Sequence, residues 1–207
     1  MLLNAVRATG ALAGVLLVAC DPPPCATPFI GDRKLPVEAV LIALAAGDTF
    51  SDIAPGATIA LEPPPQGGYV TYVGARVRNL NSCKVAFEGR LREPSTSVEL
   101  GFDRREANLL LDANGYGVPE SPARASMPNV NPCPDYGPND IHDRTLTLEV
   151  KITDPEGRST LASTPVVPRC QLSDPGYQYN CTCTCSANYF LGKCNFGDGG
   201  NDLGGVD

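Results

Sequence analysis

The sequence contains few of the residues on which common catalytic motifs depend. It has no tryptophan and one histidine, His142, and it contains no Gly-x-Ser-x-Gly, Cys-x-x-Cys, phosphate-binding loop or dinucleotide fingerprint. These absences exclude the familiar motifs of serine hydrolases, thioredoxin-like redox proteins and nucleotide-binding domains. His142 lies at the end of a proline-rich stretch, where a solvated loop position is the simplest interpretation. We therefore assign no catalytic residue and expect no cofactor and no metal.

The chain is also poor in positive charge. It has 16 Lys and Arg residues against 23 Asp and Glu, for a net charge of −7. Because phosphate backbones are bound by clustered basic side chains, nucleic acid is not an expected partner. The 20 prolines and 21 glycines favour short strands joined by many turns over long helices.

A short apolar segment occupies the N-terminus. Arg7 precedes an uncharged run over 8–19, and these twelve residues are too few for a membrane-spanning helix, which needs about 20. Such a segment is typical of an export signal. Its ending, Leu17-Val18-Ala19-Cys20, resembles the lipobox of bacterial lipoproteins, although an ordinary signal peptide is the alternative. The resemblance implies cleavage before Cys20, a diacylglyceryl group on its thiol and acylation of the new amino group.

Nine cysteines are an odd number for an exported chain, in which disulfides are expected to form. Assigning Cys20 to the lipid leaves eight disulfide candidates: Cys25, Cys83, Cys133, Cys170, Cys181, Cys183, Cys185 and Cys194. The connectivity stays open, but five of the eight lie within 170–194. If all eight are oxidised, at least one disulfide must join this segment to the rest of the chain.

Alternation of apolar and polar residues predicts strands between residues 37 and 169. In 145–153 every second residue is apolar, which places one face on a core and the other in water. Segments 69–80 and 84–92 show the same alternation, and the uniformly apolar segment 37–46 is expected to be a strand. Asp154-Pro155-Glu156-Gly157 suits a type I turn, so 145–153 and 159–167 should form a hairpin. Roughly seven such strands favour an antiparallel two-sheet sandwich.

The chain divides into five expected segments. Residues 1–19 form the signal peptide, and the proline-rich residues 20–36 form a lipidated tether, which could extend up to about 50 Å. A disulfide at Cys25 would fasten this tether to the body. Residues 37–169 form the sandwich, interrupted by a long loop over 112–144, whose prolines argue against a central strand. Residues 170–194 form a cysteine-rich segment, and residues 195–207 a flexible acidic tail.

Two short turn segments resemble those of uncharacterised myxobacterial lipoproteins that carry an immunoglobulin-like domain. They are Pro65-Gln66-Gly67-Gly68-Tyr69, before a predicted strand, and the late Asp154–Gly157 turn. The resemblance implies an immunoglobulin-like domain. Together with the strand pattern and the cysteine count, it gives the predicted fold: all-β, an antiparallel immunoglobulin-like β-sandwich with a disulfide-stapled cysteine-rich C-terminal segment. It also implies an envelope location, and it brings no known activity.

The sequence therefore predicts a lipid-anchored cell-envelope protein that acts as a non-catalytic binding or structural module. Its expected partners are the membrane, through the lipid on Cys20, and an envelope protein or a glycan. The anchoring membrane, inner or outer, stays open, with the body periplasmic or surface-exposed. Two alternatives are a secreted hydrolase that uses acidic residues or His142, and a metal-thiolate site. The second would use four C-terminal cysteines: Cys181, Cys183, Cys185 and Cys194.

Overall fold

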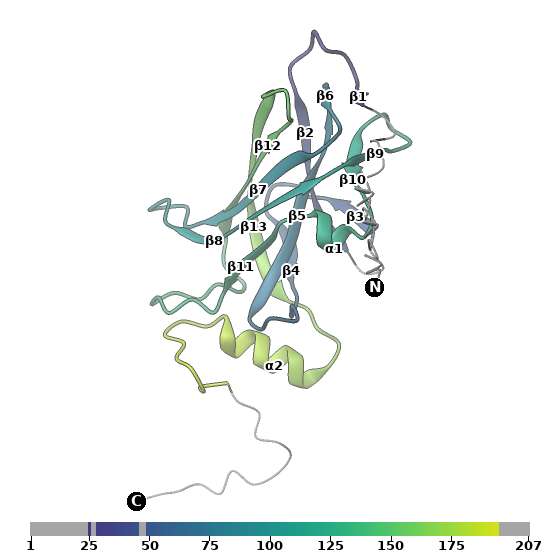
Figure 1. Cartoon of the computed structure of the whole chain (residues 1–207). Coiled ribbons are helices and arrows are strands. Elements are labelled where there is room, and N and C mark those ends of the chain that lie inside the picture. Colours follow the sequence, from purple (N-terminus) through teal and green to yellow (C-terminus); the bar gives the residue numbers. More distant parts are fainter. Residues whose placement is uncertain (1–24, 26–27, 46–48, 195–207) are drawn as a thin grey trace, which may run out of the picture.

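A computed structural model describes residues 25, 28–45 and 49–194. Within these residues two sheets pack face to face (Figure 1). One sheet has the order β3 (Thr49–Asp52), β2 (Glu38–Ala45), β5 (Tyr69–Arg78), β10 (Gly117–Pro119) and β9 (Leu109–Leu111), and β11 (Asn129–Cys133) also pairs with β5. The other has the order β4 (Ala57–Leu61), β13 (Ser159–Cys170), β12 (Leu146–Thr153), β7 (Val85–Arg92) and β8 (Glu99–Ala107). A two-stranded ladder joins β1 (Phe29–Ile30) to β6 (Leu80–Asn81), and the helices are α1 (Ala123–Ser126) and α2 (Pro175–Thr184).

The strand order is that of an immunoglobulin-like sandwich. Lettered along the chain, β2, β5, β10 and β9 take the places of strands A, B, E and D. In the facing sheet β13, β12 and β7 take those of G, F and C, and β8 adds a C′ strand. Among the described residues only β4 and β13 pair in parallel. The predicted fold, all-β with antiparallel sheets, is confirmed.

Alternating side chains fill the space between the sheets. The apolar side chains that the sequence placed on one face of β12 are all fully buried: Leu146, Leu148, Val150 and Ile152. In antibody domains the centre of the core is filled by a tryptophan on strand C, which packs against a disulfide between strands B and F. Here Phe87 on β7 is the largest fully buried side chain. None of the four disulfides joins β5 to β12.

The expected long loop over 112–144 contains more regular structure than predicted. Both β10 and β11 run antiparallel to β5, so the E strand is split by an insertion that carries α1. The prolines are accommodated because Pro119 ends β10 and Pro132 lies at an irregularity in the register of β11. The expected strand over 37–46 is confirmed as β2.

The predicted tether over 20–36 is wrong in its second half. Cys25 is linked to Cys83, β1 pairs with β6, and the N–H of Asp32 donates to Asn79 Oδ1 at 2.9 Å. Residues 28–36 therefore belong to the body. Short backbone ladders of this kind give a periodicity signal too weak to separate from a spacer. Cys20 and the signal peptide 1–19 lie outside the described residues, as does the acidic tail 195–207.

The predicted hairpin turn is held by a buried carboxylate. Asp154, 3% exposed, accepts hydrogen bonds from the N–H groups of Glu156 (3.0 Å) and Arg158 (2.8 Å) through Oδ1. Its Oδ2 accepts from the N–H of Asn81 at 2.9 Å, which ties the turn to β6.

Asp154→Ala should lower the free energy of unfolding by about 2–3 kcal/mol, because it removes charge-assisted bonds and leaves buried N–H groups unpaired. Chemical denaturation would measure the loss. Asp32→Ala is the matched control, since that exposed carboxylate accepts from one nearby N–H, that of Lys34. Equal losses of unfolding free energy in the two variants would contradict the role given to Asp154 in holding the turn.

Candidate binding site

The cysteine-rich segment forms a helix that covers one end of the sandwich (Figure 1). Asp174 caps α2 by accepting from the N–H groups of Gly176 (2.8 Å) and Tyr177 (3.0 Å), and Pro175 occupies the first turn. Cys181 and Cys183 lie within α2, and Cys185 is its C-cap residue. Residues two apart on a helix point in different directions, so each of these three sulfurs meets a different partner.

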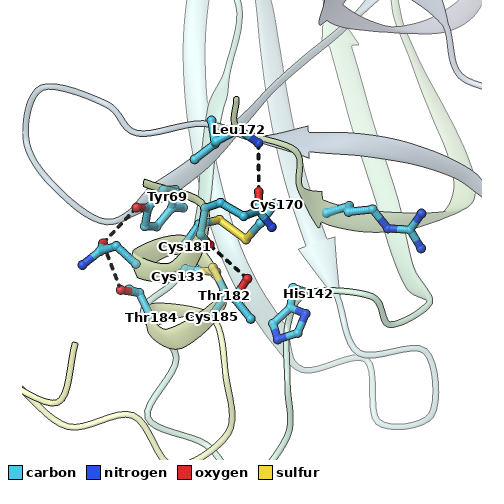
Figure 2. Close-up of a disulfide and its surroundings, with 12 residues drawn as sticks. Tyr69, Cys133, His142, Cys170, Leu172, Cys181, Thr182, Thr184 and Cys185 are labelled. Carbon is cyan, nitrogen blue, oxygen red and sulfur yellow. Dashed lines mark hydrogen bonds between the residues drawn. A yellow bond between two sulfur atoms is a disulfide. The ribbon is translucent and has the colours of Figure 1, made fainter. Parts of the chain in front are cut away.

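Four disulfides pair all eight remaining cysteines: Cys25–Cys83, Cys133–Cys185, Cys170–Cys181 and Cys183–Cys194. Two of them fix α2 to the sandwich, one at the end of β13 and one at the end of β11. Figure 2 shows these two side by side, and Cys133, Cys181 and Cys185 are almost fully buried. The C-terminal segment is therefore stapled to the body, as expected.

The pairing removes the metal-thiolate alternative. The sulfur atoms of Cys170, Cys181 and Cys185 lie within 4.8 Å of one another, which is close enough to share an ion. Zinc binds deprotonated thiolates, however, and these sulfurs are bonded to other sulfurs. Cys183 and Cys194 form a separate disulfide. The cluster is a buried cross-link.

A tyrosine connects the first residue of β5 to α2. The hydroxyl of Tyr69, which is labelled in Figure 2, donates to Asn180 Oδ1 at 2.8 Å. It also lies 3.3 Å from the carbonyl oxygen of Tyr177. Burial raises the pKa of the Tyr69 phenol, and the neighbouring Tyr177 raises it further. The Asn180 amide in turn donates to the carbonyl oxygen of Cys194 at 2.9 Å. Both sides of the Asn180 amide are thus used within the chain.

Between this contact and the solvent lies a cavity of about 490 Å³, which we name the proline–tyrosine pocket. Its wall is formed by Pro63, Pro64, Pro65, Gly67, Gly68, Tyr69, Asp174, Gly176, Tyr177 and Asn180. A volume of this size is typical of ligand sites, as is an apolar wall with few polar groups. Three prolines and two tyrosines make up half of the ten lining residues, so the pocket offers chiefly apolar contacts.

Exposed aromatic and apolar side chains surround this end of the body. We name the following residues the cap surface: Tyr136, Tyr177, Tyr179, Phe190 and Leu191, each more than half exposed. The ring of Tyr189 lies 5.7 Å from that of Tyr136 and links two loops of the surface. Tyrosine is enriched at interfaces because it gives a large contact area at low entropic cost. The cap surface therefore has the composition of a binding site.

His142 lies beside α2 in an arrangement that resembles a catalytic triad. Its Nδ1 is 3.3 Å from Asp143 Oδ2, and its Nε2 is 3.4 Å from Ser186 Oγ. The Ser186 hydroxyl, however, donates to the carbonyl oxygen of Thr182 at 2.6 Å, so its proton points away from the imidazole.

A serine nucleophile also needs free N–H groups nearby to stabilise the oxyanion. The N–H of Ser186 donates to the carbonyl oxygen of Cys183, and that of Ala187 donates to Asp140 Oδ1 at 2.7 Å. The hydrogen-bonded residues Asp143, His142 and Ser186 therefore tie the loop before β12 to the end of α2. Their geometry lends no support to the hydrolase alternative.

Asp143 contacts both His142 and Arg169. Hydrogen bonds from Arg169, and secondarily from His142, lower the pKa of its carboxyl group. Because the pKa is lower in the folded state, the interaction stabilises the fold above the ordinary carboxyl pKa, and this stabilisation is lost as the pH falls through the folded-state pKa.

Arg169→Gln should raise the pKa of Asp143, as measured by an NMR pH titration. The change in stability should be small because the pair is exposed. An unchanged titration would contradict the pairing.

The sequence does not reveal this pocket. Pro65-Gln66-Gly67-Gly68-Tyr69 marks a turn before a strand, but the opposite wall comes from α2, and Asn180 lies 111 positions after Tyr69. The only local signal was the N-cap sequence Asp174-Pro175, which marks a helix start.

The fold and the disulfides define an immunoglobulin-like module of an oxidising, extracytoplasmic compartment. In the described part of the chain, no helix is both long and apolar enough to cross a membrane.

No known family model matches the chain, and no curated protein does. Among solved structures, that of murine CRIg is similar, with 14% identity and a TM-score of 0.28 over 65% of this chain and 99% of that chain. So distant a likeness carries no argument, and the immunoglobulin-like assignment rests on the strand order.

Proposed function

We propose that the protein is anchored to the cell envelope by a lipid on Cys20 and binds an envelope partner without catalysis, through the proline–tyrosine pocket. One observation carries the proposal: an open, ring-lined pocket surrounded by exposed tyrosines lies on an end of the body that three disulfides hold together. Rigid sites lose less entropy on binding, which favours affinity.

The chemistry of the wall favours a protein segment over a glycan. Sugars need many hydrogen-bonding groups, but the Asn180 amide is already used by Tyr69 and Cys194. Asp174 Oδ1 is used by the start of α2. Prolines and tyrosines present flat apolar surfaces, such as those that bind apolar or proline-rich peptide segments. An extended apolar segment of another envelope protein is the proposed ligand.

The cysteine count supports the anchor. Eight of the nine cysteines form four disulfides, so the described residues contain no unpaired cysteine with which Cys20 could form a fifth. Its position after Leu17-Val18-Ala19 is the one that lipoprotein processing requires. A multiply acylated cysteine holds a protein stably on a membrane.

Affinity capture from detergent-solubilised envelopes, with the full protein as bait, tests the binding. Tyr177→Ala should reduce recovery of the captured protein at least about tenfold, as for an interface hot spot. Leu161→Ala is the matched control, because Leu161 is equally exposed but lies on β13, outside the pocket. Equal recovery by wild type and Tyr177→Ala would refute the pocket as the binding site.

Membrane fractionation tests the anchor. Cys20→Ala should move the protein from the membrane fraction to the aqueous one, and intact mass should show acyl groups on the wild-type protein only. A wild-type protein whose mature mass carries no lipid would refute the anchor and leave the pocket proposal standing.

A further inference from the structure

We infer that the body is held with one defined pole toward the bilayer, so that the pocket opens away from the membrane. The inference rests on the proposed lipidation of Cys20. We name as the hairpin pole the segments 28–36, 79–84 and 154–158, which lie at the end of the sandwich opposite α2 (Figure 1). The partner of this pole is a surface of anionic lipid headgroups.

The first step is the covalent link between the N-terminal segment and this pole. The Cα atoms of Cys25 and Cys83 are 5.6 Å apart, joined by a disulfide at the start of β7. Residues 28–36 also lie on the pole. Arg33 Nη1 donates to Glu156 at 2.7 Å, and the Arg158 guanidinium donates to the carbonyl oxygens of Arg33 and Leu35. The body thus begins at Cys25.

The second step is the length of chain left between the lipid and the body. Cys25 lies five positions after Cys20, and an extended chain gains at most about 3.6 Å per position, or about 18 Å in all. A free spacer as far as residue 36 would have reached up to about 50 Å. The disulfide therefore keeps the hairpin pole close to the headgroups.

The third step is the distance between the two poles. β13 begins at Ser159, just after the hairpin turn, and ends at Cys170, which is bonded to Cys181 of α2. Its twelve residues span about 40 Å at the usual rise per residue. The reach of the anchor is less than half of this length, so the anchor holds the hairpin pole close to the bilayer and leaves the cap surface distant.

Charge favours the upright pose over one in which the body lies flat. Removal of residues 1–19 takes away one charged residue, Arg7, and changes the net charge from −7 to −8. The hairpin pole has the opposite sign, a net +1, from these residues: Asp32, Arg33, Lys34, Lys84, Asp154, Glu156 and Arg158. Anionic headgroups repel the acidic remainder of the body and attract basic side chains.

Resonance energy transfer on the intact lipoprotein tests the inference. The purified, acylated protein is reconstituted into vesicles of phosphatidylethanolamine and phosphatidylglycerol that contain an acceptor-labelled lipid. A donor is introduced as a non-natural amino acid at position 84, on the hairpin pole, or at position 191, on the cap surface, so that no thiol is added. Transfer from position 84 should exceed that from position 191 at least about twofold, given the pole-to-pole distance.

A lengthened tether is the control. About ten Gly-Ser residues inserted between Asp21 and Pro22 leave every disulfide intact and add about 15–20 Å of average reach. Transfer from position 84 should then fall clearly, while circular dichroism stays unchanged. Equal transfer from both positions of the original protein, or greater transfer from position 191, would overturn the inference. A protein that fails to float with the vesicles would instead refute the lipid anchor.

Discussion

Loss of the Cys133–Cys185 disulfide, in the double variant Cys133→Ser/Cys185→Ser, should lower the free energy of unfolding by about 4 kcal/mol. The bond closes a loop of 52 residues, and in the chain-entropy model a loop of this length contributes about that amount. Both sulfurs are buried, so the replacement also places two hydroxyl groups in an apolar site. Urea denaturation of the oxidised proteins would measure the loss.

The matched control is Cys183→Ser/Cys194→Ser. That disulfide closes a loop of 11 residues at the edge of the same segment, so the same model gives a smaller contribution of about 3 kcal/mol. The first variant should also release α2 from β11 and weaken protection of the α2 amides in hydrogen exchange. Equal destabilisation and equal exchange in both variants would contradict the role given to the longer loop.

Phe87→Ala should cost about 3–5 kcal/mol, the usual range for removing a fully buried aromatic ring. Phe87 is 0% exposed and stands on β7, between Arg105 of β8 and Ile152 of β12 in the sheet register. It is the largest of the fully buried side chains, so its neighbours cannot fill the space that it leaves. Thermal and chemical denaturation would both report the loss.

The chain offers a control of the same residue type. Phe102 stands on β8 of the same sheet, but it is 45% exposed and its ring lies 4.7 Å from the Arg90 guanidinium. Phe102→Ala should cost about 1 kcal/mol or less, the usual value of an exposed cation–π contact. Similar losses of unfolding free energy for the two variants would contradict the central place given to Phe87 in the core.

The sheets could be predicted from the sequence because each strand carries its own signal. The alternation over 145–153 gave β12, and the Asp154–Gly157 turn gave the hairpin to β13, since both depend on neighbouring residues. The helix α2 was missed because its polar and cysteine residues form no apolar stripe, so its helical conformation depends on the Asp174 cap and on two disulfides.

The candidate site could not be predicted for a different reason. Its two walls, residues 63–69 and α2, lie far apart in the sequence. The hydrogen bond from Tyr69 to Asn180 joins them directly, and two disulfides fix α2 to the ends of β11 and β13. Because five of the eight cysteines lie within 170–194, at least one must bond outside that segment, and Cys133–Cys185 is that bond. Which cysteines pair depends on the packing of β11 and β13 against α2, and no local pattern encodes that packing.

The order of the disulfides along the chain has a consequence for proteolysis. Cys185 lies between Cys183 and Cys194, so the Cys133–Cys185 and Cys183–Cys194 bridges overlap in sequence. A single peptide-bond cleavage anywhere from Cys133 to Cys194 therefore leaves both fragments covalently joined, and Cys25–Cys83 protects the first part of the body in the same way. Between these two closed regions the backbone from Cys83 to Cys133 is the only covalent link among the described residues. A cut within β8 would therefore place residues 63–69 in one fragment and α2 in the other, with no covalent bond between the two walls of the pocket, whereas a nick in either closed region would leave the fragments joined.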